Sequence, residues 1–155
     1  MAGIVEARLR ELGIVLPTPA KPVANYVPFV RAGDLVFVSG QLPFAEGKIA
    51  VVGKLGEAVD IEQGQLAARL CFINIMSHLN SACDGDLDRV QQIVRLGGFI
   101  AAPAGFTAHA QVMNGASDLA VAAFGDKGRH ARAAVGVPSL PGDAAVEVDA
   151  VARIA

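Results

Sequence analysis

The C-terminal stretch of the chain, residues 128–155, is strongly apolar but contains charged side chains that need partners. Arg132 opens the apolar run, and Glu147 and Asp149 lie within its last β-branched segment. Such segments are typical of strands packed on a core. The partner of each charge is therefore solvent, a neighbouring subunit or a ligand. Solvent is the simplest partner for the two carboxylates, because they lie on the strand face opposite Val146, Val148 and Ala150.

The same stretch predicts a hairpin of two strands, 132–138 and 145–154. The turn between them contains Pro141-Gly142, and Pro followed by Gly is the pair that a type II turn requires at its centre. In this register Arg132 and Glu147 are separated along the ladder by about 13 Å. That separation excludes a simple cross-strand ion pair between them unless a bulge shifts the register.

Acidic residues also alternate in a short segment, at Asp84, Asp86 and Asp88, as they would in a calcium loop. A calcium loop needs Gly at its sixth position and a bidentate Glu at its twelfth. Those positions hold Arg89 and Arg95. We therefore interpret the segment as a solvated turn.

The histidines and one serine offer weaker signals for chemistry. His78, His109 and His130 show no metal-ligand spacing, and His78 is predicted to be a core or interface histidine bonded to backbone. Ser39 precedes Gly40 but lacks the G-x-S-x-G frame of a nucleophile elbow. A turn after a strand is the simpler interpretation of that pair.

The elements that must position these residues form one α+β domain over residues 1–155, with 1–22 as an N-terminal helix and Pro-rich lead-in. Asp60 and Gln63 form a capping box that opens a helix to about Ala82. A mixed sheet with two long helices on one face is expected. The remaining elements are strands at 27–31, 35–38, 48–52 and 89–101, a helix at 107–124 that ends at an αL Gly125, and a bulge or close backbone approach at Gly97-Gly98.

The composition favours an assembly of subunits. Hydrophobic residues make up 53% of the 155 residues and charged residues 18%, with a mean hydropathy of +0.46. No apolar run approaches the roughly 20 residues that a membrane helix needs. A subunit interface is therefore the expected place for the surplus apolar surface.

Charge and cysteine content restrict the expected partners and compartment. The net charge is −2, Trp is absent and no basic cluster stands out, which argues against nucleic-acid binding. The charged residues in the segment 1–13 argue against a signal peptide and favour a cytoplasmic protein. Cys71 and Cys83 lie about 18 Å apart on the predicted helix, beyond disulfide reach.

Three segments together resemble a known family. RAAVGVPSLP (132–141) followed by VEVDAVA (146–152) is similar to the C-terminal signature of the RidA/YjgF family of reactive intermediate deaminases. NYVPFVRAGDLVFVSGQLP (25–43) resembles the first hairpin of that family. VMNGASDLAVAAFGDKGRHAR (112–132) resembles its longer subgroup, which is often labelled endoribonuclease. The resemblance runs from about residue 23 to the end.

The resemblance implies a chorismate-mutase-like fold and a homotrimer, with a barrel-like centre and three clefts between subunits. It implies that Arg132 binds a substrate carboxylate, which suits a guanidinium because its donors can meet both oxygens. Glu147 would position or activate the water that hydrolyses 2-imino or enamine acids to 2-oxo acids and ammonia, without a cofactor or metal. The other implied cleft positions are Tyr26, Ser39, Gly40, Asn114 and Ala134.

One of these positions departs from the family pattern. Ala134 stands where many deaminating members have Cys, so only its backbone could orient a substrate. Two other functions therefore stay open: a non-catalytic sensor that binds a small carboxylate metabolite in the same clefts, and a ribonuclease. The missing basic patch counts against the ribonuclease, because phosphate contacts dominate nucleic-acid affinity.

Overall fold

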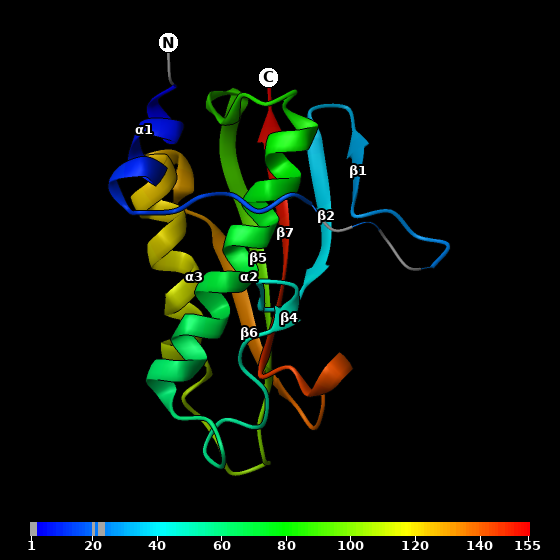
Figure 1. The fold of residues 1–155 in the computed structure, drawn as a ribbon, viewed down its shortest axis with the longest axis vertical. Coiled ribbons are helices and arrows are strands. Elements are labelled where there is room, and N and C mark those ends of the chain that lie inside the picture. The colour runs from blue at the N-terminus through cyan, green and yellow to red at the C-terminus, as the bar shows by residue number, and fades with distance from the viewer. Residues whose placement is uncertain (1–2, 20, 22–23) are drawn as a thin grey trace.

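A computed structural model describes residues 3–19, 21 and 24–155 (Figure 1). Its helices and strands follow the predicted order along the chain closely. The pairing of the last two strands differs from the prediction. The elements are α1 (Ile4–Glu11), β1 (Phe29–Ala32), β2 (Leu35–Gln41), β3 (Phe44–Ala45), β4 (Lys48–Ile49), α2 (Ile61–Ala82), β5 (Val90–Ala101), α3 (His109–Phe124), β6 (Ala131–Val137) and β7 (Val146–Ile154), with 3₁₀ turns η1 (Leu87–Arg89), η2 (Gly125–Gly128) and η3 (Pro141–Asp143).

The long helix α2 begins at the predicted capping box. Asp60 Oδ1 accepts from the Gln63 amide at 2.8 Å, and Gln63 Oε1 accepts from the Asp60 amide at 2.9 Å. These bonds satisfy N–H groups that a helix start leaves without partners. At the other end the Gly85 amide donates to Asn80 O, and Gly85 has the positive φ of 88° expected of a helix stop.

Helices α2 and α3 pack closely because Gly115 leaves α3 without a side chain at the contact. A methyl group placed at Gly115 would overlap the backbone of Gln65 on α2. Glycine inside a helix costs about 1 kcal/mol relative to alanine, so the close helix contact must offset that loss. Helix α3 ends at Gly125. The φ of 64° and ψ of −138° of this residue lie outside the αL region that the sequence predicted.

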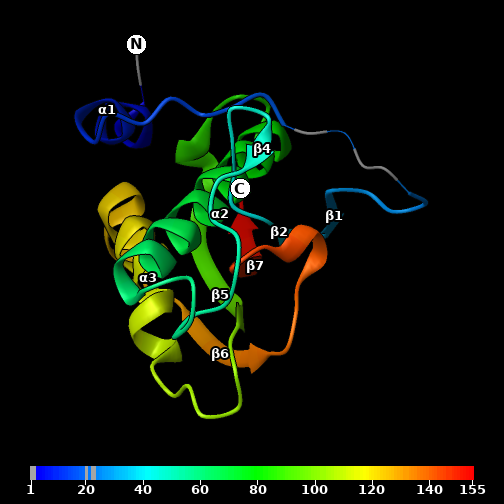
Figure 2. The same ribbon diagram turned by 60° about the horizontal axis from the view of Figure 1, so that its bottom comes forward.

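Within the described residues, five strands form one sheet in the order β1-β2-β7-β5-β6, and β3 and β4 form a separate small ribbon. Both long helices lie on one face of the sheet, which we call the helix face (Figure 2). The core fills the space between them and includes Phe72, Met76, Leu96, Ile100 and Val148. The predicted α+β layers with a mixed sheet are confirmed, while the strand predicted at 48–52 is shorter than expected.

The predicted terminal hairpin is wrong. Strand β6 pairs in parallel with β5, and β7 instead lies antiparallel between β5 and β2. Parallel strands need a long crossover, and α3 supplies it between β5 and β6. The segment around Pro141-Gly142 is a 3₁₀ turn, and the Gly53 amide donates to Asp143 O, so this connection is bonded to the segment before α2.

The second face of the sheet, which we call the open face, carries none of the helices that the structure describes. Its apolar side chains are partly exposed: Val30 is 52% exposed, Phe37 46% and Val135 48%. The glycine pair in β5 does not form a bulge, because the register shifts lie earlier in that strand. It allows a close approach instead, since a methyl group at Gly98 would contact the Met113 sulfur.

Candidate functional site

Arg132 lies on the edge strand β6, with its side chain against α3. Its Nη1 donates to Asn114 Oδ1 at 2.8 Å and to Ser117 Oγ at 3.0 Å, and its Nη2 donates to Ala110 O at 3.2 Å. A guanidinium has five N–H donors, so two of them have no acceptor among residues 3–19, 21 and 24–155. Within the described residues no carboxylate forms an ion pair with Arg132. The cation is therefore held in place and left uncompensated.

Glu147 lies on the central strand β7, opposite Phe99 of β5. Its carboxylate rests against Gly40, where a methyl group would come within 3.0 Å of the Glu147 Cδ. Gly40 lies in a register irregularity of β2 that interrupts its pairing with β7. Within the described residues no hydrogen bond or ion pair reaches this carboxylate. Burial, and secondarily the charge of Asp149, raises the pKa of Glu147 above its ordinary 4.5.

Strand register places Arg132 and Glu147 on opposite faces of the sheet. Arg132 pairs with the buried Leu96, which shares the helix face with its partner Ala150. Glu147 pairs with Phe99, three residues further along β5, and therefore lies on the open face. The expectation that these two residues do not form an ion pair holds. The hairpin geometry from which we derived that expectation does not.

The predicted site residues form two groups. The first, called the arginine half-site, comprises Arg132, Asn114 and Ala134 on β6 and α3. The second, called the glutamate half-site, comprises Ser39, Gly40 and Glu147 on β2 and β7. One chain does not bring the two half-sites together.

Tyr26 belongs beside the glutamate half-site. It precedes β1 and is 53% exposed. Ser39 Oγ donates to the carbonyl of the next residue, Val27, at 2.8 Å, and the Ser39 amide donates to Pro28 O. These two bonds hold the chain that carries Tyr26 against β2.

Sequence reasoning missed two residues next to Arg132. They are Ser117 and His130. Ser117 accepts from Arg132, and its Oγ lies 2.8 Å from His130 Nε2. The sequence alone offers His130 only as a candidate metal ligand. The available signal was the helical spacing of Asn114 and Ser117, which places both polar side chains on one side of α3. Recognising it required knowing that β6 runs alongside α3.

His78 is buried, as predicted, but it is not bonded to backbone through Nδ1. That atom has no hydrogen-bond partner within the described residues, and the side chain is only 3% exposed. Burial lowers the pKa of His78 below 6.5.

The acidic turn and the cysteines have structural roles. Asp88 accepts from the amides of Ile4 and Val5 at the start of α1, and these bonds lower the pKa of Asp88. Asp86 caps η1.

Cys71 and Cys83 are buried and free, and burial raises the pKa of both thiols.

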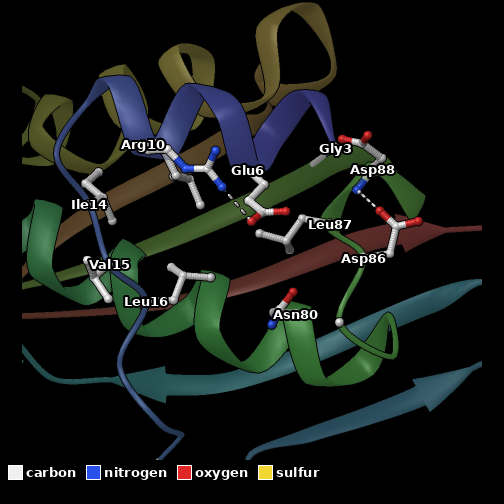
Figure 3. Close-up of a pocket in the computed structure, with 12 residues that line it drawn as sticks. Gly3, Glu6, Arg10, Ile14, Val15, Leu16, Asn80, Asp86, Leu87 and Asp88 are labelled. Carbon is white, nitrogen blue, oxygen red and sulfur yellow. Dashed lines mark hydrogen bonds and ion pairs between the residues drawn. The ribbon is translucent and has the colours of Figure 1, made fainter. Parts of the chain in front are cut away.

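A cavity of about 390 Å³ lies between α1 and the end of α2 (Figure 3). Glu6 on its wall is paired with Arg10 at 3.0 Å. None of the predicted site residues lines this cavity.

Over residues 3–19, 21 and 24–155, no group of three or more His, Cys, Asp or Glu residues could hold a metal ion. None of the helices in that part of the chain is long and apolar enough to cross a membrane.

The mixed sheet, the two helices on one face and the two half-sites define a protein of the chorismate-mutase-like class. The chain matches the family model described as YjgF/chorismate mutase-like, putative endoribonuclease, over residues 6–154, and it belongs to that family. It is 46% identical to Protein TCP17 of Trypanosoma cruzi over 154 residues, which is 99% of this chain and 96% of that protein. The family resemblance of the sequence is thereby confirmed.

Two solved structures are similar over almost their whole length. The protein Atu1372 of Agrobacterium tumefaciens, described as of unknown function, is 47% identical with a TM-score of 0.93, covering 98% of this chain and 93% of that one. A putative endoribonuclease of Shewanella oneidensis MR-1 is 34% identical with a TM-score of 0.94, covering 98% and 100%.

Proposed function

We propose that the protein hydrolyses small 2-imino or enamine acids to 2-oxo acids and ammonia, in clefts between the subunits of a homotrimer. The observation that carries this proposal is the state of Arg132. Its guanidinium is fixed by three acceptors on α3, and two of its N–H donors have no acceptor in the part of the chain that the structure describes. A carboxylate has two oxygens that can accept from such a pair. An anionic substrate group is therefore the natural ligand of this residue.

The opposite placement of the half-sites supports a cleft shared by two subunits. Arg132 faces α3, and Glu147 lies on the open face of the same sheet. In a closed trimer, the arginine half-site of one subunit would meet the glutamate half-site of its neighbour. The exposed Phe37 and Val135 on the open face would then be covered by the neighbouring subunits.

Glu147 is suited to move a proton in this cleft. Its carboxylate has no partner within the described residues, and its pKa is raised by burial and by Asp149, so it is a stronger base than an exposed glutamate. In the proposed reaction, Glu147 takes a proton from water as the oxygen adds to the imine carbon. Glu147 returns that proton to the nitrogen to give a carbinolamine, and then passes the hydroxyl proton to the amine as the C–N bond breaks, so that a 2-oxo acid and ammonia leave. Arg132 holds the substrate carboxylate throughout.

The Ala134 position limits which atoms can help to orient the substrate. Ala134 lies on β6, the edge strand of the described sheet, and pairs with Gly98 of β5. Its side chain packs against the core and offers no polar group. Any contact to substrate from this position must therefore come from the backbone, which does not depend on a Cys side chain.

Ammonia release from freshly generated 2-imino acids tests the proposed reaction. The parent protein should accelerate release over the buffer rate, and Arg132→Ala should not. Sedimentation equilibrium should give about three times the chain mass of 15.9 kDa. Binding of 2-oxo acids without any acceleration would instead favour the sensor function.

Mixed trimers test whether two subunits share each cleft. Arg132→Ala and Glu147→Gln chains should each be inactive alone. After random mixing in equal amounts, about a quarter of the clefts would combine an intact Arg132 with an intact Glu147 from the neighbour. Recovery of about a quarter of the parental rate is expected. No recovery in mixed trimers, shown to be mixed by mass spectrometry, would contradict the shared cleft.

A further inference from the structure

A continuous series of hydrogen bonds connects a backbone carbonyl to the guanidinium of Arg132. His130 Nδ1 lies 2.6 Å from Gly128 O, and His130 Nε2 lies 2.8 Å from Ser117 Oγ. Arg132 Nη1 donates to that same Ser117 oxygen at 3.0 Å. The imidazole and the guanidinium therefore share one hydroxyl.

The direction of each bond follows from the chemistry of its atoms. A carbonyl oxygen only accepts, so His130 carries its proton on Nδ1 and donates it to Gly128 O. In the neutral ring Nε2 is then an acceptor, and the Ser117 hydroxyl donates to it. The Ser117 oxygen keeps lone pairs for the Arg132 donor. Every member of the series is satisfied when His130 is neutral.

We propose that His130, acting through Ser117, is a positioning residue for Arg132 and couples the binding of an anion there to its own protonation. The inference rests on the proposed function, because the anion in question is the substrate carboxylate. A proton added to His130 makes Nε2 a donor, and the Ser117 oxygen then accepts from both cations. An imidazolium and a guanidinium within about 6 Å of each other repel, and a carboxylate on Arg132 relieves that repulsion.

The coupling has a definite sign. A carboxylate bound at Arg132 favours protonated His130, so binding is expected to strengthen as the pH falls. By reciprocity, protonation of the imidazole favours the bound carboxylate by the same free energy. Histidine in general is the side chain whose ordinary charge change falls between about pH 5 and pH 8, so a coupling of this kind would make substrate retention depend on pH.

Other charged groups lie on the elements around His130 but are not bonded to it. Asp126 pairs with Arg129 at 3.4 Å, and Arg95 pairs with Asp149 at 3.6 Å. Within the described residues none of the remaining titratable side chains on these elements forms a hydrogen bond or ion pair with His130; they are Lys127 on η2, and Asp118 and His109 on α3.

Calorimetric titration with 2-oxobutanoate, at about pH 8 and about pH 5.5, tests the coupling in the whole assembled protein. The parent should bind about fivefold more tightly at the lower pH, the low end of typical coupling between sites. His130→Gln should remove this pH dependence. Ser117→Ala should weaken binding at both pH values and also remove the dependence. Ser117→Thr keeps the hydroxyl and should restore both properties.

His109→Gln is the matched control, because it removes a histidine that lies on α3 together with Ser117 and leaves the bonded series intact. It should keep the parental pH dependence. Equal pH dependence in the parent and His130→Gln proteins would overturn the coupling. The coupling would also be overturned if His109→Gln lost the pH dependence of binding and His130→Gln kept it. Undiminished binding in Arg132→Ala would instead overturn the proposed carboxylate site itself.

Discussion

Replacing Gly40 by alanine tests whether the free space beside Glu147 is needed for chemistry. The added methyl would overlap Glu147 Oε1 and would lie 3.0 Å from Cδ and 3.2 Å from Cγ. Because protein interiors are packed at van der Waals contact, the carboxylate would have to move by about 1 Å. Gly40 does not have a positive φ, so the backbone itself accepts alanine.

The expected effect falls on turnover and not on affinity. A displacement of about 1 Å in a group that must meet a water and a substrate costs roughly 100-fold in rate. The fold should lose no more than about 1 kcal/mol, the low end of overpacking, because the displaced atoms are the end of a flexible side chain. Affinity for a 2-oxo acid should stay within a factor of about two, because the carboxylate is held by Arg132, whose three hydrogen-bond acceptors all lie on α3 of its own chain and not beside Gly40.

Ammonia release and calorimetry on the same preparations measure the two effects. Gly105→Ala is the matched control: Gly105 has no positive φ, and a methyl there meets no atom within 4 Å. It should retain the parental rate. Gly40→Ala protein with unchanged turnover would refute the placement of Glu147 in the reaction. A loss of affinity equal to that of Arg132→Ala would refute the division into two half-sites.

Three further results are expected. Arg132→Ala should weaken binding of a 2-oxo acid by about 2–5 kcal/mol, while Glu147→Gln should keep the affinity and reduce turnover by about 10²–10⁴; equal affinities in all three proteins by calorimetry would contradict the site. Burial lowers the pKa of His78, so the unfolded chain binds a proton at His78 more readily than the folded chain does. The free energy of unfolding should therefore be greatest above pH 6.5 and fall as the pH drops through the pKa of His78 in the folded chain. Urea unfolding at about pH 7.5 and 5.5 should show that slope, and His78→Phe should reduce it; an identical slope in both would contradict the assignment. With a net charge of −2, RNA should bind weakly in filter assays, and cleavage that purifies with the protein and vanishes in Arg132→Ala would contradict this.

Local patterns in the sequence were sufficient to predict the helices and to predict which side chains of a single strand point toward the core. The capping box at Asp60 placed the start of α2, and the alternation around Glu147 placed that residue on the face away from the core. Both features depend on neighbours within a few residues. The first hairpin was also predicted correctly, because its turn fixes the register of β1 and β2.

Strand pairing over long distances could not be predicted in the same way. Val146 and Val148 fit a strand beside β6 as well as one beside β5, and only the crossover through α3 decides between them. The missed bond between Ser117 and His130 has the same cause, since it exists only because β6 runs alongside α3. The separation of Arg132 from Glu147 likewise emerges from the register of β5 with both of its neighbours.

The placement of the half-sites on opposite faces of one sheet also affects how the protein can evolve. Substitutions on β6 and α3 would change the anion that is recognised, and those around Gly40 would change the chemistry. Within the described residues no side-chain hydrogen bond or ion pair joins the two sets, so a substitution in one set leaves the bonds of the other unchanged. Within one fold, a lineage could thus exchange substrates while keeping its reaction, or lose its reaction while keeping its ligand.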